Sequence, residues 1–496
     1  MNSTTTPVKP SAQFDVYVRS ISLTDGPATI QIDLEIAGVS FFSQVIYHSI
    51  PSWQALWARC CDVERHPQFQ SHLLGALVAW ECMRFLALGG ERVVLCPGLH
   101  CNETVQQLWT YCFRHQLGEW RYLNQLQYET DSLPELIVSA ESSGTQSAGK
   151  QPEAGTVTGK PQRVLLTNGG GKDTLAGMLL LTGADINFDL YEGYLPIGNN
   201  SLALQQQLLQ RLKDAAAPST TETHRVTVED NFFSCPESVF DQMGVQAKHT
   251  KIDFAVGHTA NYIGYFPVIL YHGYTDVWFN IERSADNEMV HWAGDSINHQ
   301  WCKSVDYQQK AREVFTEVTG LTWFHGFSST LRGLYDMSIY SIVAQYPVQM
   351  QATHSCNYGK PWCNNCPKCC FCYLMMCAHF DESFAKVVVG SNTSLFTIPE
   401  NRVHWESLLD PKQVAWECVP SHEECQVAGY ICLQKGLNYP VLQEFVNLTQ
   451  DDAEQLWQRY TDVDWTEIPE EVHTVLRDVL TQSPNLVCNE RFGLPV

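Results

Sequence analysis

The chain has 496 residues, and its 31 Lys and Arg residues against 54 Asp and Glu residues give a formal net charge of -23 at pH 7. This balance argues against an extended nucleic-acid interface, because phosphate backbones are bound by clustered basic side chains, whereas a small anionic ligand can still bind in a locally positive pocket. The length predicts two or three domains, and the lack of a long apolar run or an apolar leader predicts a cytoplasmic protein without a membrane partner.

Residues 1–138 predict an α+β domain. Residues 14–50 alternate apolar and polar side chains around the turn sequence TDGP, which is typical of antiparallel strands. Residues 70–88 have helical periodicity and precede a short predicted strand and a second helix. Residues 139–162 are rich in Ser, Gly and Pro and contain almost no apolar side chains, so we expect a flexible linker there.

Residues 163–350 predict an α/β domain, because strands and helices alternate along this segment. The predicted strands are 163–167, 186–192 and 224–228, and the predicted helices between them are 173–182 and 201–214. This order is typical of a parallel, doubly wound sheet with helices on both faces. Ligands of such sheets bind at the carboxyl ends of the strands. We also expect residues 305–346 to be largely helical.

The sequence LTNGGGKDT at residues 166–174 joins the first of these strands to the following helix. Consecutive glycines allow backbone amide groups to approach an anion, and a helix N-terminus adds positive partial charge. The spacing differs from the G-x-x-x-x-G-K-[ST] loop of P-loop NTPases and from the G-x-G-x-x-G loop of dinucleotide folds. We predict a phosphate-binding loop of another type, and a simple tight turn is the alternative.

This loop resembles that of the PP-loop ATP pyrophosphatases of the HUP, or adenine nucleotide alpha hydrolase-like, superfamily, whose usual form is S-G-G-x-D-S. Thr174 replaces the last Ser of that pattern, and a glycine replaces the first. The resemblance implies that ATP and Mg²⁺ bind here and that PPi is released, with Thr174 supplying a hydroxyl group and Asp173 positioning Mg²⁺ or the loop. The implied nucleotide-binding residues are Asn168, Gly169, Gly170, Gly171, Lys172, Asp173 and Thr174.

Five stretches farther along the chain indicate a more specific family within this superfamily. GHTANYIGYF, NIERSADNE, INHQWCKS, HSCNYGKPWCNNCPKC and WECVPSHEE occur between residues 257 and 424, in an order similar to the ATP-dependent epimerases of UDP-MurNAc-L-Ala-L-Glu. That family adenylates the terminal L-Glu carboxylate, inverts its Cα and releases the D-Glu product with AMP, in the synthesis of a peptidoglycan precursor. The chemistry is consistent, because an acyl adenylate has a far more acidic Cα–H than a free carboxylate, and a base and an acid can then move the proton between faces.

The stretch NIERSADNE follows an apolar run and provides candidates for substrate binding. Arg283 could clamp a carboxylate or a phosphate in bidentate fashion, and Glu282 or Asp286 could bind Mg²⁺ through carboxylate oxygens. A solvated loop with capping side chains is the alternative.

Three further residues are candidates for proton transfer: His258, His299 and Lys303. A His titrates near neutral pH, and a buried Lys can do so. His299 and Lys303 would lie on one face if their segment were helical. Cys302 is a thiol alternative, although its neighbour Trp301 is equally consistent with burial, and each His could be purely structural.

A cysteine-rich segment is predicted at residues 351–385, followed by a mixed C-terminal region at 386–496. The spacing C-x₆-C-x₂-C-x₂-C predicts a structural Zn²⁺ site with four thiolate ligands. An iron–sulfur cluster, or no metal, are the alternatives. Three further cysteines in an apolar stretch are expected to be buried free thiols. The predicted ligands are Cys356, Cys363, Cys366 and Cys369.

Two other functions are compatible with the loop. In a PP-loop tRNA thiolase or amide-forming ligase, sulfur or nitrogen would attack the adenylate, although the acidic chain disfavours tRNA binding. A nucleotide-binding homologue without catalysis is the second, since two positions of the loop depart from its usual form. The sequence does not predict the oligomeric state.

Overall fold

The structure is a computed structural model that describes residues 14–60, 69–125, 133–138, 162–194, 201–232, 235–243 and 262–482. Nearly all of the predicted linker, and His258, lie outside these residues. The strands are β1 (Phe14–Thr24), β2 (Ala28–Ile36), β3 (Val39–Tyr47), β4 (Gly90–Val94), β5 (Glu135–Ile137), β6 (Val164–Thr167), β7 (Phe188–Tyr194), β8 (Thr223–Asp230), β9 (Asp276–Phe279), β10 (Val290–Trp292), β11 (Asp295–Ile297) and β12 (Gly326–Ser329).

The helices complete the secondary structure of the described residues. The α-helices are α1 (Trp53–Arg59), α2 (Phe69–Met83), α3 (Glu103–Gln116), α4 (Gly118–Leu123), α5 (Lys172–Gly183), α6 (Leu202–Ala216), α7 (Glu237–Gln242), α9 (Phe266–His272), α10 (Val305–Thr319), α11 (Asp336–Val343), α12 (Pro347–Met350), α13 (Pro367–His379), α14 (Glu382–Val389), α15 (Arg402–Leu409), α16 (His422–Gln434), α17 (Pro440–Phe445), α18 (Gln450–Thr461) and α19 (His473–Gln482). The 3₁₀ helices are η2 (Arg84–Leu88), η6 (Tyr262–Tyr265), η7 (Arg283–Asp286), η8 (Trp301–Lys303), η9 (Leu395–Thr397), η10 (Pro399–Asn401), η11 (Trp465–Glu467) and η12 (Glu470–Val472).

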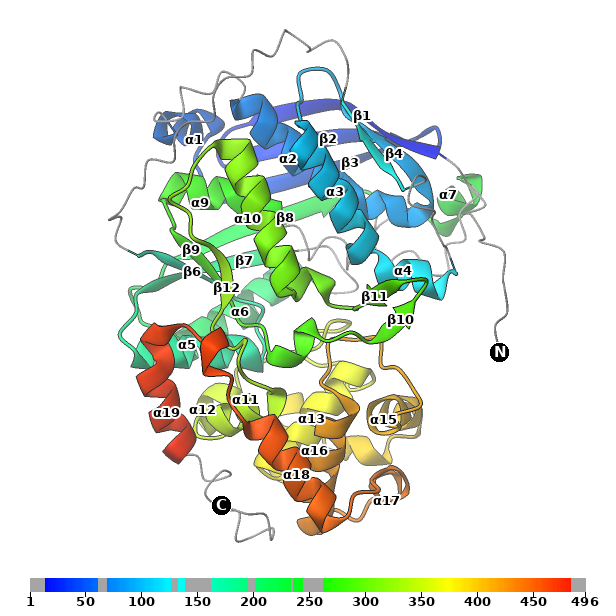
Figure 1. Ribbon diagram of the computed structural model, residues 1–496, viewed down its shortest axis with the longest axis vertical. Coiled ribbons are helices and arrows are strands. Elements are labelled where there is room, and N and C mark those ends of the chain that lie inside the picture. The colour runs from blue at the N-terminus through cyan, green and yellow to red at the C-terminus, as the bar shows by residue number, and fades with distance from the viewer. Residues whose placement is uncertain are drawn as a thin grey trace.

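One large sheet organises the described part of the chain, in the order β12-β9-β6-β7-β8-β3-β2-β1-β4-β5. The pairs β8·β3, β3·β2 and β2·β1 are antiparallel, and the other neighbouring pairs are parallel. Helices α2, α3 and α10 cross in front of the strands, and the helices from α13 to α18 gather at the opposite end of the molecule from β1 and β2 (Figure 1). The fold is therefore mixed α/β, with a mostly parallel sheet and helices on both sides.

The expected alternation of strands and helices is confirmed at β6, α5, β7, α6 and β8. β6 is a short strand whose apolar residues Val164, Leu165 and Leu166 are buried, as expected for a strand covered on both faces. The segment 305–346 is only partly helical, because α10 ends at Gly320 in a left-handed conformation and β12 then joins the sheet. The stretch containing His299 and Lys303 is not an α-helix either, since η8 begins only at Trp301.

The strands of the predicted N-terminal domain continue directly into those of the predicted α/β domain. Ser43 to Tyr47 of β3 pair with Asp230 to Val226 of β8. A buried ion-pair cluster lies at this junction, where Arg84 contacts Glu81 at 2.8 Å and Asp230 at 2.7 Å. The two predicted segments therefore share one sheet.

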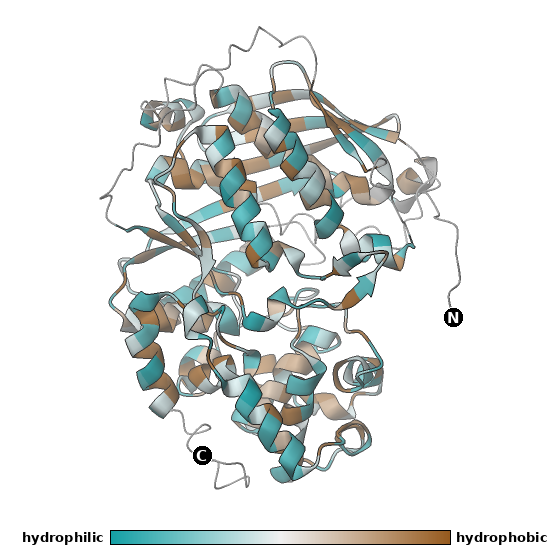
Figure 2. Ribbon diagram, in the orientation of Figure 1, coloured by the Kyte–Doolittle hydropathy of each residue, from teal (hydrophilic) through white to brown (hydrophobic). Residues whose placement is uncertain are grey.

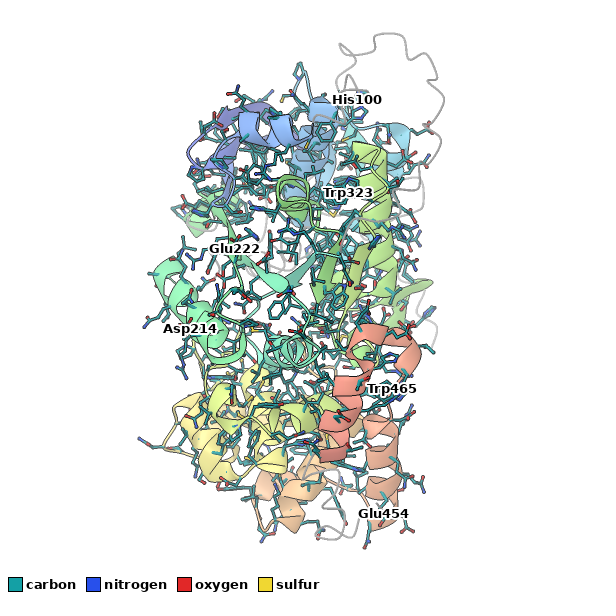
Figure 3. All side chains as sticks on the ribbon, turned by 90° about the vertical axis from the view of Figure 1, so that its left-hand side faces the viewer. His100, Asp214, Glu222, Trp323, Glu454 and Trp465 are labelled. Carbon is teal, nitrogen blue, oxygen red and sulfur yellow. The ribbon has the colours of Figure 1, made fainter. Side chains whose placement is uncertain are left out.

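Strongly hydrophobic residues recur along the strands of the sheet and along the helices that pack on it (Figure 2). α13 is almost entirely buried, and its cysteines and aromatic residues pack into the same core as α11 and α16. Seen from the side, side chains fill the space between the layers along the whole length of the molecule (Figure 3). None of the described helices combines the length and the apolar character needed to cross a membrane.

Candidate active site

A cavity of about 400 Å³ lies at the carboxyl ends of β6, β7 and β9. Its walls include Asn168 after β6, Tyr194 at the end of β7, and Asn280 after β9. Side chains of β2, β3 and β8 form a further, apolar wall. The cavity thus lies where parallel α/β sheets bind their ligands, and the antiparallel strands of the N-terminal segment close one side of it.

The glycine loop between β6 and α5 lines this cavity. The amide of Gly169 donates to Oγ1 of Thr174 at 3.1 Å, and the amide of Gly170 donates to Oδ1 of Asn168 at 3.2 Å. Asn168 is itself fixed by donating to Glu192 at 2.8 Å. Two loop amides are therefore bound to neighbouring side chains in this conformation, and a phosphate would take the place of these side chains as acceptor.

The two charged residues of the loop occupy different environments. Asp173 lines the cavity, whereas Lys172 is fully buried and does not. The Lys172 ammonium group lies 2.5 Å from Asp173 and 2.6 Å from Asp336, and it lies over the ring of Tyr340. Lys172 is therefore held as the counter-ion of Asp173 and Asp336 at the first turn of α5.

Three lysines form a positive wall of the cavity: Lys303, Lys360 and Lys368. Nζ of Lys360 donates to the carbonyl of His354 at 3.0 Å, and Nζ of Lys303 donates to Oε1 of Gln300 at 2.6 Å. Burial lowers the pKa of Lys360 to about 8. This cluster provides a local site for phosphate or carboxylate oxygens on a protein that is otherwise acidic.

Aromatic rings lie beside these charges. Tyr191 and Tyr265 stack with ring centroids 3.8 Å apart, and Tyr262 stacks on Phe279 at 4.4 Å. All four side chains line the cavity. The arrangement suits a ligand that combines a flat or apolar part with a polyanionic part.

Glu282 and Arg283 point in different directions, and neither lines the cavity. Burial would raise the pKa of Glu282, but the ammonium groups of Lys303, Lys172 and Lys368 outweigh it and hold this pKa well below its usual range. Arg283 lies 3.4 Å from Asp464 and over the ring of Tyr335. The structure therefore places Glu282 among the lysines as their counter-ion and directs Arg283 away from the cavity.

His299 lies at the edge of the cavity in a polar cluster. Its Nδ1 donates to Oε2 of Glu119. Ligand-type atoms of His299, Glu417 and Cys418 all lie within 4.8 Å of one another. Cys418 lines the cavity, as does Lys303, the lysine four positions after His299. The polar cluster therefore connects His299 to the cavity through Cys418.

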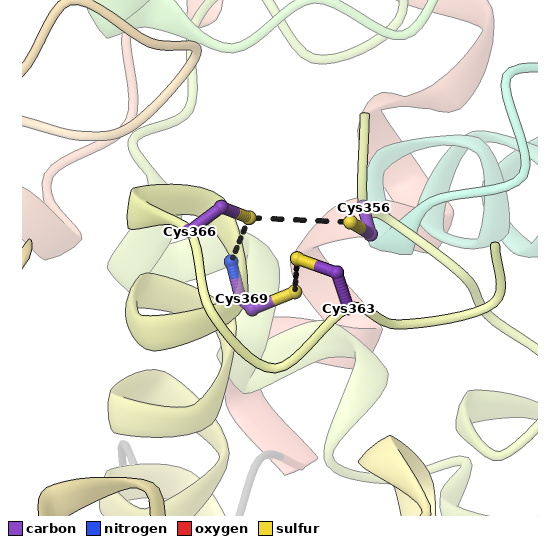
Figure 4. Close-up of side chains that lie close together, drawn as sticks. All are labelled: Cys356, Cys363, Cys366 and Cys369. Atoms are coloured by element: carbon purple, nitrogen blue, oxygen red, sulfur yellow. Dashed lines mark hydrogen bonds between the residues drawn. The ribbon is translucent and has the colours of Figure 1, made fainter. Parts of the chain in front are cut away.

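The four predicted metal ligands lie together (Figure 4). Sγ of Cys356 lies 3.9 Å from Sγ of Cys366, and Sγ of Cys363 lies 3.8 Å from Sγ of Cys369. A tetrahedron of thiolates with Zn–S bonds of about 2.3 Å has edges of about 3.8 Å, so this spacing fits a zinc ion. The amide of Gly359 donates to Sγ of Cys356 at 3.3 Å, as expected for a thiolate. The cluster could therefore bind a metal without rearrangement.

The metal cluster and the cavity are built from one segment. Ser355, Asn357, Lys360 and Lys368 line the cavity and alternate along the chain with the four cysteines. The sequence analysis did not identify these four cavity residues or Cys418 as candidates. All five lie in stretches that carried the family resemblance. Lone Lys, Ser and Asn residues carry no periodic signal, so only their sequence context pointed to them.

The fold and the site define an α/β protein with a lysine-lined cavity next to a four-cysteine cluster. A family profile described as the MurL N-terminal domain matches residues 263–328, and one described as the MurL C-terminal domain matches residues 347–459. The matched segments include Lys303, Cys418 and the four cysteines, and the glycine loop lies outside them.

Two relatives carry the same name, UDP-N-acetyl-alpha-D-muramoyl-L-alanyl-L-glutamate epimerase. The one from a Micromonospora species is 26% identical over 390 residues, which cover 74% of this chain and 76% of the relative. The one from Salinispora tropica is 30% identical over 165 residues, which cover 32% of this chain and 35% of the relative. No solved structure matches the chain. These similarities support a relationship to the MurL epimerases.

Proposed function

We propose that this chain is an ATP-dependent epimerase that acts on UDP-MurNAc-L-Ala-L-Glu in the synthesis of a peptidoglycan precursor. It adenylates the terminal L-Glu carboxylate, inverts the Cα and releases the D-Glu product with AMP and PPi. The observation that carries the proposal is one cavity lined by the glycine loop and by Lys303, Lys360 and Lys368. The names of the two relatives support the same substrate.

ATP would supply the adenylyl group that turns the carboxylate into an activated acyl ester. We assign the loop from Asn168 to Thr174 to the pyrophosphate end of ATP, as in the PP-loop proteins of the HUP superfamily. Asp173 is the cavity-lining carboxylate of this loop and the proposed partner of Mg²⁺. The three lysines bind the negative oxygens of the two substrates, where local positive charge lowers the cost of bringing anions together.

The aromatic side of the cavity orients the flat or apolar parts of these substrates. Tyr191 and Tyr265 form one stacked pair and Tyr262 and Phe279 another, and both pairs are held by the surrounding core. Rings fixed in this way present a preformed surface and exclude water from the reacting carboxylate. Water exclusion protects an acyl adenylate from hydrolysis before the Cα has been inverted.

The four-cysteine cluster is a structural zinc site in this proposal. Its donor set and its sulfur spacing fit Zn²⁺, and its bonding would fix residues 351–385. These residues supply Lys360 and Lys368 to the cavity, so the cluster holds two of the three lysines in position. The substrates and the release of AMP place the enzyme in the cytoplasm.

The decisive experiment incubates the purified chain with Mg-ATP and UDP-MurNAc-L-Ala-L-Glu, and measures PPi, AMP and the configuration of the terminal glutamate in the nucleotide-linked product. We expect PPi and D-Glu only when ATP and the peptide-linked nucleotide are both present. Parallel reactions contain free L-Glu, tRNA with a sulfur donor, or no acceptor. Release of PPi with tRNA alone would favour the thiolase, and a lack of PPi with every acceptor would favour a homologue that has lost catalysis.

A further inference from the structure

Two cysteine side chains line the cavity beside Lys303. Cys302 precedes this lysine in η8, and Cys418 comes from the loop before α16. The two sulfurs are close enough for the charge of Cys418 to raise the pKa of Cys302. Both lie outside the group of four cysteines that could bind a metal. The cavity therefore holds a pair of thiols from distant parts of the sequence.

Cys418 is surrounded by groups that favour its thiolate. A ring nitrogen of His299 lies within 4.8 Å of its Sγ, and Nδ1 of His299 donates to Glu119. Burial would raise the pKa of the Cys418 thiol, but the ammonium group of Lys303 and the imidazole of His299 outweigh it and lower this pKa. Glu417 acts in the opposite direction, and its carboxylate is held by the amide of Asn357 at 2.7 Å.

Cys302 has the opposite character. Its side chain is buried next to Trp301, and burial raises the pKa of its thiol to about 12. Lys303 acts against this shift and Cys418 adds to it. Cys302 is therefore a neutral thiol at pH 7. One cavity thus contains a thiolate that can accept a proton and a thiol that can donate one.

We propose that Cys418 and Cys302 are the catalytic base and acid that invert the Cα of the activated glutamate, with the substrate lying between the two sulfurs. This inference rests on the proposed function, since it assigns the proton transfers of the same reaction. It also gives His299 and Lys303 the role of positioning residues that hold the Cys418 thiolate.

The proton transfers balance without a further reactant. The Cys418 thiolate takes the Cα proton of the L-adenylate, the C–H electron pair moves into the enolate, and a Cys418 S–H bond forms. The Cys302 S–H bond then breaks on the opposite side, and its proton forms the new C–H bond of the D-epimer. The resting state returns when a proton passes from Cys418 to Cys302 through solvent. The two thiols suit these opposite roles, because Lys303 lowers the pKa of the Cys418 thiol and burial keeps Cys302 protonated until it donates.

The test separates proton transfer from activation by running the reaction in D₂O with Mg-ATP. We expect Cys302→Ala to exchange deuterium into the Cα of recovered L-substrate without forming D-Glu. We expect Cys418→Ala to release PPi from the L-substrate without exchange. Epimerisation should fall at least about 100-fold in both variants, as for the loss of an acid or base. Cys235→Ser, at a partly exposed cysteine outside the cavity, is the matched control and should retain both reactions.

A second measurement does not depend on activity. Iodoacetamide at pH 6 should alkylate Cys418 of the wild-type chain faster than Cys235, and His299→Gln should remove this difference. Peptide mass spectrometry assigns the modified residue. Equal reactivity of the two cysteines, or inversion by Cys418→Ala at the wild-type rate, would overturn the proposal.

The remaining outcomes are also informative. Loss of a metal ion per chain in Cys418→Ser would overturn the proposal and identify His299, Glu417 and Cys418 as a second metal site. Absence of PPi release in the wild type would contradict the proposed function itself. A wild type that releases PPi and forms D-Glu, but whose cysteine variants do so too, would contradict only the thiol pair.

Discussion

The position that a Cβ atom would occupy on Gly170 lies 2.2 Å from Nε2 of His354. The amide of His354 also donates to the carbonyl of Gly170 at 2.8 Å, so the loop and the segment leading to the cysteine cluster touch through backbone and side chain. Gly170 has a φ of +82°, a conformation that glycine adopts at little cost. The contact connects the proposed phosphate loop to the proposed zinc segment.

Gly170→Ala should therefore destabilise the protein by about 2–5 kcal/mol, the sum of a left-handed non-glycine residue and a steric clash in a packed site. Gly169→Ala is the matched stability control, because its nearest neighbour would be Oγ1 of Thr174 at 3.9 Å. Urea unfolding measures both. Equal stability of the two variants would show that His354 moves aside freely.

Asp173→Asn should abolish PPi release and leave the fold intact. Asp173 lines the cavity, whereas Lys172 keeps Asp336 as its second carboxylate partner at 2.6 Å. The control is Asp214→Asn, because Asp214 lies at the exposed surface of α6 (Figure 3). AMP formation and the unfolding midpoint are measured for both variants. Full AMP formation by Asp173→Asn would contradict the assignment of the loop.

Elemental analysis of the purified chain should find about one zinc ion per chain, as expected for a four-thiolate site. Cys363→Ser should lose the metal, because three thiolates bind it much less tightly. Cys370→Ala should keep it, since Cys370 is buried in α13 outside the group of four. Iron together with visible absorbance would instead identify an iron–sulfur cluster.

Much of the architecture near the loop could be predicted, because short apolar strands and amphipathic helices have distinct periods. β6, α5, β7, α6 and β8 follow the predicted order. The pairing of β3 with β8 could not be predicted, because it joins residues as far apart in sequence as Ser43 and Asp230, and no local pattern encodes such a contact.

The candidate site could be predicted where the spacing of residues along the sequence indicates a metal site. The four cysteines lie together, as their C-x₆-C-x₂-C-x₂-C pattern predicted. The ion-pair partners of Lys172 and Arg283 could not be predicted, because the direction of a side chain depends on its tertiary partners. Asp336 holds Lys172 and Asp464 attracts Arg283, and both partners are distant in sequence. The same limit explains why Cys418 was not identified.

The protein should lose stability as the pH falls from about 6.5 to about 3, in part through buried histidines. Burial lowers the pKa of His379 to about 3, whereas an unfolded His titrates near 6.5. In this window the unfolded chain binds a proton that the folded chain does not, so each such His contributes up to about 1.4 kcal/mol per pH unit. Burial and the neighbouring His224 lower the pKa of His272 in the same way.

Denaturant unfolding at several pH values tests this contribution. His379→Gln should reduce the slope of unfolding free energy against pH between 3 and 6.5. His291→Gln is the control, because the His291 side chain is 65% exposed and should leave the slope unchanged. An unaltered slope in His379→Gln would show that His379 becomes protonated within the folded protein.

Arg84→Met should lower the free energy of unfolding more than Arg92→Met does, and the two substitutions form a matched pair in the N-terminal segment. Arg84 is 1% exposed and pairs with Glu81 and Asp230, so its loss leaves two buried carboxylates without their cation and should cost about 3–5 kcal/mol. Arg92→Met removes an ion pair to Asp15 whose arginine is 52% exposed, and should lower the free energy of unfolding far less than Arg84→Met does.

The same pair of variants tests how the two halves of the sheet unfold. Because Asp230 belongs to β8 and Arg84 follows α2, the ion-pair cluster connects the strands before the predicted linker to those after it. We expect circular dichroism and tryptophan fluorescence to report one transition, shifted as a whole by Arg84→Met. Two transitions, of which Arg84→Met moves only the first, would mean that residues 1–138 unfold independently despite the shared sheet.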